Sequence, residues 1–404
     1  MNSAPEPKAY ADQDLIDLYL KKSIEERWAG RTVKLDVPVD VFSSYQIDVG
    51  TMFLLREVSS HGRKWSRVLD LGCGYGPVSV YLSVNGIADA VDAIDPDAVA
   101  VAFTEHNARL NECADVSAAP GVAYSDIPRA SYDAIVSNVP AKAGQSVHEL
   151  MLLGAHRHLR ENGEVWIVVV ASLEEPVDAI LSKPEVKLLN KASRKGHVVY
   201  NFAFSGEPAV PHAPYLRDSM EFRWRDWSYE MTSFQGLAEF DERSHATDLI
   251  FHLLEKLSET GEFPSVLVGN CGQGHVPVFL ARHFGGLQRM CVASRNLIAL
   301  EATKHNLEGC GFTGDVCFSH TPLFDCAAAA FRPDLIVAAL REREGYDIHL
   351  GKASRALSKY PACPLVLACA SGKASRLEKA FRASGRRTSL KTKRKGFSAF
   401  LLSP

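Results

Sequence analysis

The 404-residue sequence lacks a long hydrophobic run, because its longest uninterrupted apolar stretch covers only residues 165–171. A membrane-spanning helix needs about 20 such residues. Residues 1–7 are mostly polar, and no apolar segment follows them, which argues against a secretory signal. We therefore expect a cytoplasmic protein that makes no contact with a membrane.

Cysteine pairs at the spacing of a zinc site are also absent. The nine cysteines are irregularly spaced, and no two of them form a Cys-x-x-Cys pair. An odd number of scattered cysteines is typical of reduced intracellular thiols. The sequence therefore predicts neither a disulfide framework nor a bound metal.

A strong net charge is missing as well, since 45 basic and 48 acidic side chains give a formal net charge of -3. The hydrophobic fraction of 46% and the charged fraction of 23% are ordinary for a folded globular chain. At about 150 residues per domain, the length predicts two or three domains.

Glycine is concentrated in one informative segment, residues 67–76 (RVLDLGCGYG). An apolar run ends near the carboxylate of Asp70, and Gly72, Gly74 and Gly76 follow at every second position. Glycines in this pattern let a strand turn sharply into a helix while a ligand approaches the backbone. The free amides at the start of the helix favour anionic or electron-rich groups. The segment therefore predicts a nucleotide-binding turn.

Polar residues also follow the next strands that the sequence predicts. Residues 90–95 end in Asp95, which lies 23 residues after Gly72, where an α/β nucleotide site places an acceptor for ribose hydroxyls. A third strand is expected to end at residues 125–126, and a fourth, 132–138, runs into an Asn-x-Pro turn. Ligands bind at the carboxyl edge of open α/β sheets. The residues expected at this edge are Asp70, Asp95, Pro96, Asp126, Asn138 and Pro140.

Residues 30–205 as a whole resemble the "methyltransferase small" domain of the class I S-adenosylmethionine-dependent methyltransferases. The resemblance is narrowest to the ribosomal RNA small-subunit methyltransferase C family, which methylates the exocyclic N2 of guanine. The segments that carry it occur in the family's order: 41–50 (VFSSYQIDVG), 70–76 (DLGCGYG), 137–140 (SNVP), 143–144 (AG), 161–167 (ENGEVWI) and 194–200 (RKGHVVY).

The resemblance implies a Rossmann-like, seven-stranded, mostly parallel sheet with an antiparallel last strand. It also implies S-adenosylmethionine as the cofactor, with its methionine end near Asp70 and the glycine turn, its ribose at Asp95 and its adenine amine at Asp126. The cofactor-binding residues are then Asp70, Gly72, Cys73, Gly74, Gly76, Asp95, Pro96, Asp126 and Asn138. Asn138 and Pro140 are the catalytic residues, which position the amine that accepts the methyl group.

One departure from the family pattern bears on the substrate. Ala141 stands where the family has an aromatic or other apolar residue that stacks on a base. Phe42 or Tyr45 from the preceding loop could supply that plane. Otherwise the chain methylates a small molecule or a protein, or it retains the cofactor without catalysis as an RNA assembly factor.

The second half of the chain repeats the first at an offset between 198 and 201 residues. Residues 266–276 (VLVGNCGQGHV) overlay 68–78, and residues 333–337 overlay 132–136. An offset this constant indicates a duplicated fold. The second copy has lost polar site residues: Val268, Asn270, Ser294 and Ala339 replace Asp70, Gly72, Asp95 and Asn138. We therefore expect only the first copy to bind S-adenosylmethionine. The family also pairs an active with a decayed domain, but in the opposite order.

The sequence thus predicts an α/β protein of two tandem class I methyltransferase domains. The first domain, residues 1–205, contains a cap helix expected over 12–28 and the cofactor-binding domain. A proline-rich linker, 206–214, joins it to the degenerate domain, 215–404.

Positive charge is concentrated in the degenerate domain. Residues 352–395 contain thirteen Lys or Arg and one acid, Glu378, which gives this segment +12 and leaves the rest of the chain at -15. A segregated basic block is typical of a nucleic-acid surface. We expect it to dock structured ribosomal RNA, with phosphate contacts from Arg386, Arg387, Lys393 and Arg394.

Overall fold

The computed structural model describes residues 12–404 except 29, 44, 327 and 329. The chain divides into two compact units, the first ending at Tyr215 and the second beginning at Leu216. Within the described residues, no helix is long and apolar enough to cross a membrane.

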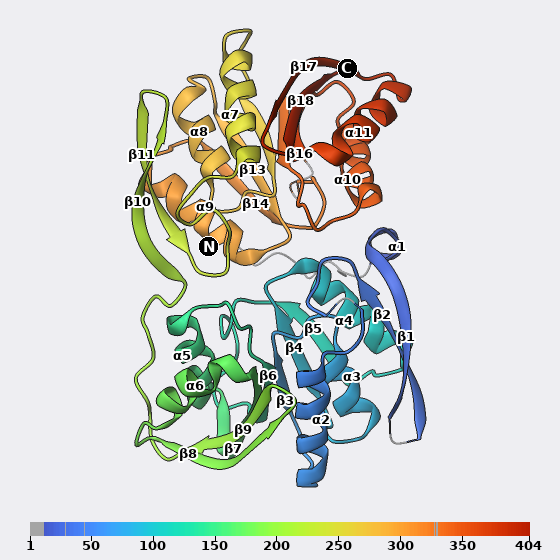
Figure 1. Ribbon diagram of the computed structural model, residues 1–404, viewed down its shortest axis with the longest axis vertical. Helices are drawn as coiled ribbons and strands as arrows, with labels where there is room; N and C mark the ends of the chain where they lie inside the picture. The colour runs from blue at the N-terminus through green and yellow to red at the C-terminus, as the bar shows by residue number, and fades with distance from the viewer. Residues whose placement is uncertain (1–11, 29, 44, 327, 329) are drawn as a thin grey trace. The chain divides into compact units, whose positions relative to one another are not determined.

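The first unit contains a seven-stranded sheet in the order β5-β4-β3-β6-β7-β9-β8 (Figure 1). β3 to β7 are parallel, whereas β9 runs antiparallel to β7 and β8 antiparallel to β9. The strands are β3 (Val68–Leu71), β4 (Val91–Asp95), β5 (Val116–Pro120), β6 (Tyr132–Asn138), β7 (Leu159–Val170), β8 (Val186–Arg194) and β9 (His197–Phe204). The predicted fold class and the antiparallel last strand are confirmed.

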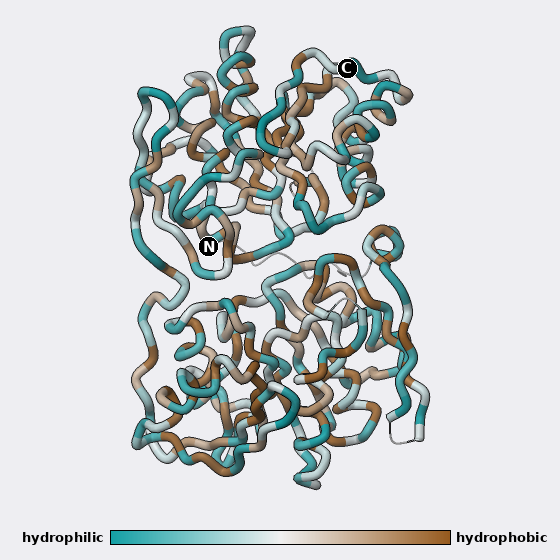
Figure 2. The backbone as a smooth tube through the Cα atoms, viewed as in Figure 1, coloured by the Kyte–Doolittle hydropathy of each residue, from teal (hydrophilic) through white to brown (hydrophobic). Residues whose placement is uncertain are grey.

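Helices cover both faces of this sheet. Successive side chains of a buried strand point to opposite sides, so each face presents an apolar layer that a helix covers. Leu69 and Ile135 pack in one apolar layer, and Val68 and Ala134 pack in the other. Figure 2 shows apolar stretches running through the interior of each unit. The helices are α2 (Val49–His61), α3 (Pro77–Val84), α4 (Ala98–Leu110), α5 (Gln145–Leu153) and α6 (Glu174–Leu181), with short 3-10 turns at Gly154–Arg157 and Ala171–Leu173.

The cap helix expected over residues 12–28 is wrong beyond its first two turns. Helix α1 covers only Gln13–Tyr19, and Leu20–Trp28 form β1, which pairs with β2 (Arg31–Pro38) in an antiparallel hairpin. Ile24 and Trp28 lie four residues apart and so suggested a helix. Their partner strand contains Val33, Leu35 and Val37, all buried, and strand pairing with this alternating segment overrides the local helical spacing.

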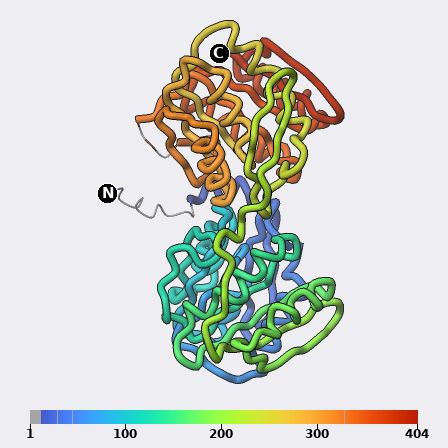
Figure 3. The backbone as a smooth tube through the Cα atoms, turned by 90° about the vertical axis from the view of Figure 1, so that its left-hand side faces the viewer, coloured from blue at the N-terminus to red at the C-terminus, as the bar shows by residue number. Residues whose placement is uncertain are grey.

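The second unit repeats the same architecture after a hairpin of β10 (Leu216–Trp224) and β11 (Trp227–Phe234). Its sheet has the order β14-β13-β12-β15-β16-β18-β17, which matches the first sheet strand for strand. The course of the chain through each unit can be followed in Figure 3. Its other elements are α7 (His245–Ser258), β12 (Ser265–Gly269), α8 (His275–His283), β13 (Arg289–Ser294), α9 (Leu297–Gly309), β14 (Asp315–His320), β15 (Leu335–Ala339), α10 (Tyr346–Lys359), β16 (Leu365–Ala370), α11 (Ser371–Ala383), β17 (Arg387–Arg394) and β18 (Phe397–Ser403).

Candidate active site

The glycine-rich turn joins β3 to α3 at the carboxyl edge of the first sheet. Gly72, Gly74 and Gly76 have φ values of 80°, 59° and 88°, a region that L side chains rarely adopt. A Cβ atom on Gly76 would lie 3.0 Å from the Thr104 side chain, so this glycine lets α3 pack on α4. A Cβ atom on Gly72 or Gly74 would meet nothing within 4 Å. The turn therefore leaves open space against its backbone at these two positions.

Asp95 ends β4 beside this turn. Its carboxylate accepts hydrogen bonds from the Gly74 amide at 3.0 Å and from the Asp97 amide at 2.9 Å. Burial, together with the nearby charge of Asp97, raises the pKa of Asp95 to about 7. Hydrogen bonds donated by ligand hydroxyls would favour the ionised form and lower that pKa again. Asp95 therefore suits a partner that donates to it.

Asp70 lies beneath the turn and is only 1% exposed. One oxygen of its carboxylate accepts from the Ser79 amide at 3.1 Å and from the Ser79 hydroxyl at 2.6 Å. Burial raises the pKa of Asp70 to about 7. These contacts tie the first turn of α3 to β3, so Asp70 holds the glycine turn in place.

Two other residues predicted to bind the cofactor are Cys73, within the turn, and Pro96, which follows β4. Cys73 is buried, and the Thr104 hydroxyl donates to its sulfur at 3.3 Å. Burial raises the pKa of the Cys73 thiol well above its usual value, so Cys73 contributes backbone to the turn and not a reactive thiolate. Pro96 follows Asp95 directly and is partly buried.

The expected end of the third strand is wrong. Strand β5 ends at Pro120, and the buried residues 121–124 follow it, with the Gly121 amide bonded to the Asp95 carbonyl at 3.1 Å. Asp126 lies six residues beyond the strand in an exposed turn with a φ of 62°. Asp126 is therefore not the end of a strand, and its predicted contact with adenine stays a prediction.

Asn138 ends β6 and is held by the start of α2. Its side-chain amide donates to the Asp48 carboxylate at 3.2 Å and to the Thr51 hydroxyl at 2.8 Å. Because an ionised carboxylate can only accept hydrogen bonds, the amide nitrogen must be the atom that faces Asp48. The Asn138 carbonyl oxygen then remains to accept a hydrogen bond from a bound group.

Asp48 caps α2 as well, since the same oxygen accepts from the Gly50 amide at 2.9 Å and from the Thr51 amide at 3.2 Å. Asp48 and Thr51 hold the Asn138 side chain, and the sequence alone did not single them out. Asp48 lies within segment 41–50, which contributed only to the family resemblance. An aspartate directly before an apolar helical pattern was the available signal for a helix cap.

Pro140 belongs to the turn that follows Asn138. Its carbonyl accepts from the Ala143 amide at 3.2 Å and lies 2.9 Å from Nε2 of the buried His148. The Val139 amide bonds the Val168 carbonyl at 3.0 Å. These bonds fix the backbone immediately after Asn138.

Phe42 and Tyr45 lie on the loop before Asp48 and are highly exposed, at 68% and 70%. The Lys21 ammonium lies 3.2 Å from the centre of the Tyr45 ring and covers one of its faces. Ala141 is also exposed. The structure therefore offers two aromatic rings near the start of α2 and none at position 141.

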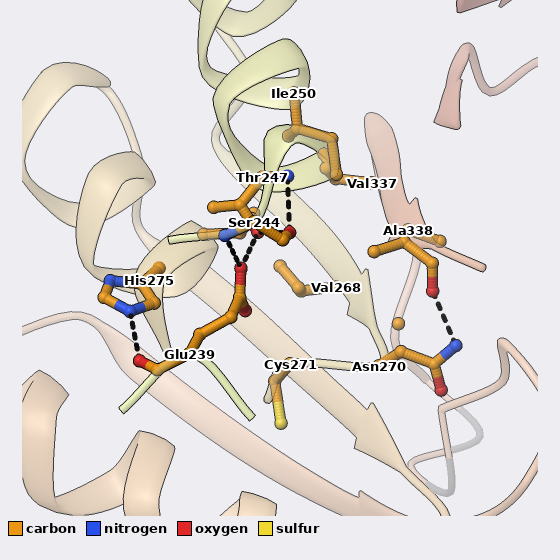
Figure 4. Close-up of a pocket in the computed structure, with 13 residues that line it drawn as sticks. Glu239, Ser244, Thr247, Ile250, Val268, Asn270, Cys271, His275, Val337 and Ala338 are labelled. Atoms are coloured by element: carbon orange, nitrogen blue, oxygen red, sulfur yellow. Dashed lines mark hydrogen bonds between the residues drawn. The ribbon is translucent and has the colours of Figure 1, made fainter. Parts of the chain in front are cut away.

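The corresponding edge of the second unit has a different chemistry (Figure 4). Asn270, with a φ of 57°, replaces Gly72, and its side-chain amide donates to the Ala339 carbonyl at 2.7 Å. Glu239 accepts from the Ser244 amide at 2.7 Å and from the Thr247 hydroxyl at 2.6 Å. The polar groups around this pocket are thus bonded to one another.

Bulky and charged side chains also lie at this edge of the second sheet, after the ends of β13, β14 and β15. Glu344 and Lys352 are fully buried, and the Lys352 ammonium bonds both Glu344 oxygens at 2.7 and 2.8 Å. Arg295, which follows β13 and is 1% exposed, lies 3.5 Å from Glu344. A Cβ atom on Gly269 would clash with the buried ring of Phe324. Arg295, Phe324 and Glu344 thus follow the ends of β13, β14 and β15 at this edge of the second sheet.

Comparison with known proteins agrees with the fold. Residues 32–201 match the model of the methyltransferase small domain. Ribosomal RNA small subunit methyltransferase C of Acinetobacter baumannii is 34% identical over 143 residues, which cover 34% of this chain and 42% of that protein. Ribosomal RNA large subunit methyltransferase G of Streptomyces coelicolor is 34% identical over 133 residues, 32% of this chain and 35% of that protein. The chain thus spans less than half the length of these two relatives.

A solved structure is similar over nearly the whole chain. The 16S rRNA N2 methyltransferase RsmC of T. thermophilus, in complex with AdoMet and guanosine, has a TM-score of 0.69 and 17% identity, and the match covers 96% of this chain and 99% of that one. At this identity the likeness establishes the tandem fold of both units. The family model matches the unit that retains the open glycine turn. Residues 32–201 therefore belong to the methyltransferase small domain family of class I S-adenosylmethionine-dependent methyltransferases.

Proposed function

We propose that the first unit transfers a methyl group from S-adenosylmethionine to the exocyclic N2 of a guanine in ribosomal RNA, and that the second unit docks the RNA. The observation that carries the proposal is the orientation of Asn138, whose carbonyl oxygen is left to accept a hydrogen bond from an amine N–H. The named relatives support RNA as the substrate, since both are ribosomal RNA methyltransferases.

The residues of the first unit fit the cofactor. Gly72 and Gly74 leave open space against their backbone, and the Asp95 carboxylate suits the two hydroxyls of a ribose. When bound, the cofactor supplies an electrophilic methyl group on a sulfonium. Asp70 fixes the turn from below through Ser79. Because the second unit has Val268 and Ser294 in place of these two acids, we assign cofactor binding to the first unit alone.

Asn138 supplies the positioning that guanine N2 requires. The lone pair of this amine is delocalised into the ring, so the site must hold the group with that lone pair aligned with the methyl group. The Asn138 carbonyl oxygen and the backbone carbonyl that follows it accept hydrogen bonds from the two N–H groups of the amine, and the one proton lost on methylation passes to solvent. Positioning of this kind can lower a barrier by roughly 7–11 kcal/mol. Asp48 and Thr51 act as positioning residues, because they fix the amide of Asn138.

Phe42 and Tyr45 are the side chains that we propose to stack on the target base in place of residue 141. Base–aromatic stacking contributes about 1–3 kcal/mol, so Phe42→Ala and Tyr45→Ala together should lower kcat/KM for RNA by roughly 5- to 150-fold. Leu188→Ala removes another exposed apolar side chain, 47% exposed on β8, and serves as the control. Rates of methyl transfer to RNA measure the effect. Equal rates for the double variant and the control would exclude both rings from the site.

The basic block in the second unit forms an exposed edge. β17 is the edge strand of its sheet, and Arg387, Lys391 and Lys393 alternate along it as exposed side chains. Arg394 is the last residue of the strand, and Lys395 lies in the turn that follows. We propose that these five residues, the β17 edge, bind RNA phosphates.

Arg386 does not belong to the β17 edge, which corrects the expectation from the sequence. Its side chain is only 9% exposed, and its guanidinium donates to the Cys363 carbonyl at 3.1 Å and to the Pro361 carbonyl at 2.5 Å. The guanidinium satisfies backbone carbonyls between α10 and β16. Charge density along the sequence could not reveal this role.

Reversing charges on the β17 edge tests the docking proposal. Arg387→Glu, Lys393→Glu and Lys395→Glu in one protein should weaken RNA binding and make it less salt-dependent, with the logarithmic slope falling by about 0.7–0.9 for each phosphate that the protein no longer neutralises. The control protein carries Lys256→Glu, Arg282→Glu and Lys304→Glu, an identical change in charge at exposed positions on α7, α8 and α9. RNA affinity is measured for both as a function of salt. If both variants bind alike, the β17 edge is an ordinary solvated surface.

A further inference from the structure

Three cysteines of the second unit converge in space although they are far apart in the sequence. The sulfur atoms of Cys291, Cys317 and Cys326 all lie within 4.8 Å of one another, and those of Cys317 and Cys326 are 3.7 Å apart. We propose that these residues, the thiol cluster, bind one thiophilic metal ion through three thiolates.

The backbone explains why the thiols meet. Cys291 on β13 and Cys317 on β14 are register partners in a parallel pair, so their side chains point to the same face of the sheet. Cys326 comes from the segment that follows β14 and packs on the layer that contains α10 and α11. Because the ligands come from two strands and a loop, the sequence shows no paired Cys-x-x-Cys spacing. The expectation of no bound metal depended on that spacing.

The distances between the three sulfur atoms are close to those of a tetrahedral metal site. Two thiolates bound at about 2.3 Å in a tetrahedral site lie about 3.8 Å apart. The Cys317–Cys326 separation of 3.7 Å already has this value. The third sulfur would need to move inward by about 1 Å or less from the 4.8 Å limit, which a change of side-chain torsion achieves. Cys291 and Cys326 are buried, whereas Cys317 is partly exposed and provides a route of entry.

The surroundings also suit the charge of such a site. Three thiolates and one divalent ion carry a net charge of −1, and two cations lie close by. Arg289 acts electrostatically on Cys317, and the Lys359 ammonium, which also pairs with the Asp325 carboxylate, lies 3.4 Å from the Cys326 carbonyl. Binding breaks the three S–H bonds and forms three sulfur–metal bonds, and the released protons go to solvent, so affinity should rise with pH.

The experiment titrates Cd²⁺ and, separately, Zn²⁺ into the full-length chain after it has been reduced and treated with chelator. We expect a thiolate-to-Cd²⁺ charge-transfer band that saturates at one equivalent, and a melting temperature that rises with either metal. Cys317→Ser and Cys326→Ser should each weaken binding by more than the roughly 10–100-fold that loss of an outer-shell partner costs. Cys310→Ser removes a partly exposed thiol outside the cluster and should leave binding unchanged.

Circular dichroism of the metal-free variants establishes that each is folded before binding is compared. If either variant is unfolded, Cys317→Ala or Cys326→Ala replaces it. Saturation at one equivalent that depends on Cys317 and Cys326 supports the site. The proposal is overturned if the reduced protein gives no band at one equivalent, or if folded cluster variants bind as tightly as Cys310→Ser.

Discussion

Replacing Asn138 by alanine is expected to lower methyl transfer to RNA by roughly 100-fold or more while leaving the affinity for S-adenosylmethionine nearly unchanged. The Asn138 oxygen is the acceptor that the site leaves for the incoming amine, because the amide nitrogen is bonded to Asp48 and Thr51. An interaction made mainly in the transition state lowers turnover when it is removed, whereas cofactor binding depends on Asp95 and the glycine turn. Single-turnover rates and calorimetry measure the two quantities separately.

Two further variants separate chemistry from folding in this test. Asn138→Asp retains an acceptor oxygen but places a second carboxyl group beside Asp48, so the orientation is lost and activity should also fall. Asn190→Ala changes an exposed asparagine on β8 and should retain full activity. If Asn138→Ala transfers methyl groups as fast as Asn190→Ala, the Asn-x-Pro turn has no role in positioning the amine.

The second large effect concerns cofactor stoichiometry. Calorimetry on the full-length chain should give one S-adenosylmethionine per chain, and Asp95→Ala should weaken binding by about 1.5–3 kcal/mol, or roughly 10- to 150-fold, through loss of a charged acceptor. Ser294→Ala is the matched control, because Ser294 occupies the position of Asp95 in the second unit and its hydroxyl accepts the Asn296 amide at 3.2 Å. That substitution should leave binding unchanged.

The second unit is expected to bind no cofactor for a physical reason. Glu344, Lys352 and Arg295 form a buried ionic group at the carboxyl edge of its sheet, and opening it would leave uncompensated buried charges. Phe324 takes further space beside Gly269. A stoichiometry of two, or equal effects of Asp95→Ala and Ser294→Ala, would refute the assignment of the cofactor to the first unit.

The sequence predicted the parts of the site that are built from residues close together in the chain. The glycine turn and Asp95 follow directly from strand and turn patterns, and the duplication follows from an almost constant offset. Contacts between distant segments were not accessible in this way. Asn138 meets Asp48 across 90 residues, and no periodicity encodes that pairing.

The errors have the same origin. Residues 20–28 have helical spacing, yet pairing with β2 makes them a strand. Arg386 belongs to a basic run, yet tertiary packing buries it against carbonyl oxygens. Asp126 was placed by the expected end of a strand that stops at Pro120 instead. In each case long-range packing decided between locally acceptable alternatives.

The central claim is that this chain methylates ribosomal RNA, and labelled S-adenosylmethionine tests it most directly. The purified chain is incubated with labelled cofactor and with separate RNA, protein and small-molecule fractions from cells that lack the enzyme, and the modified product is identified by mass spectrometry. The account predicts label in ribosomal RNA as N2-methylguanosine, absent when Asn138→Ala is used. Label confined to protein or small molecules, or cofactor binding without transfer to any fraction, would contradict it.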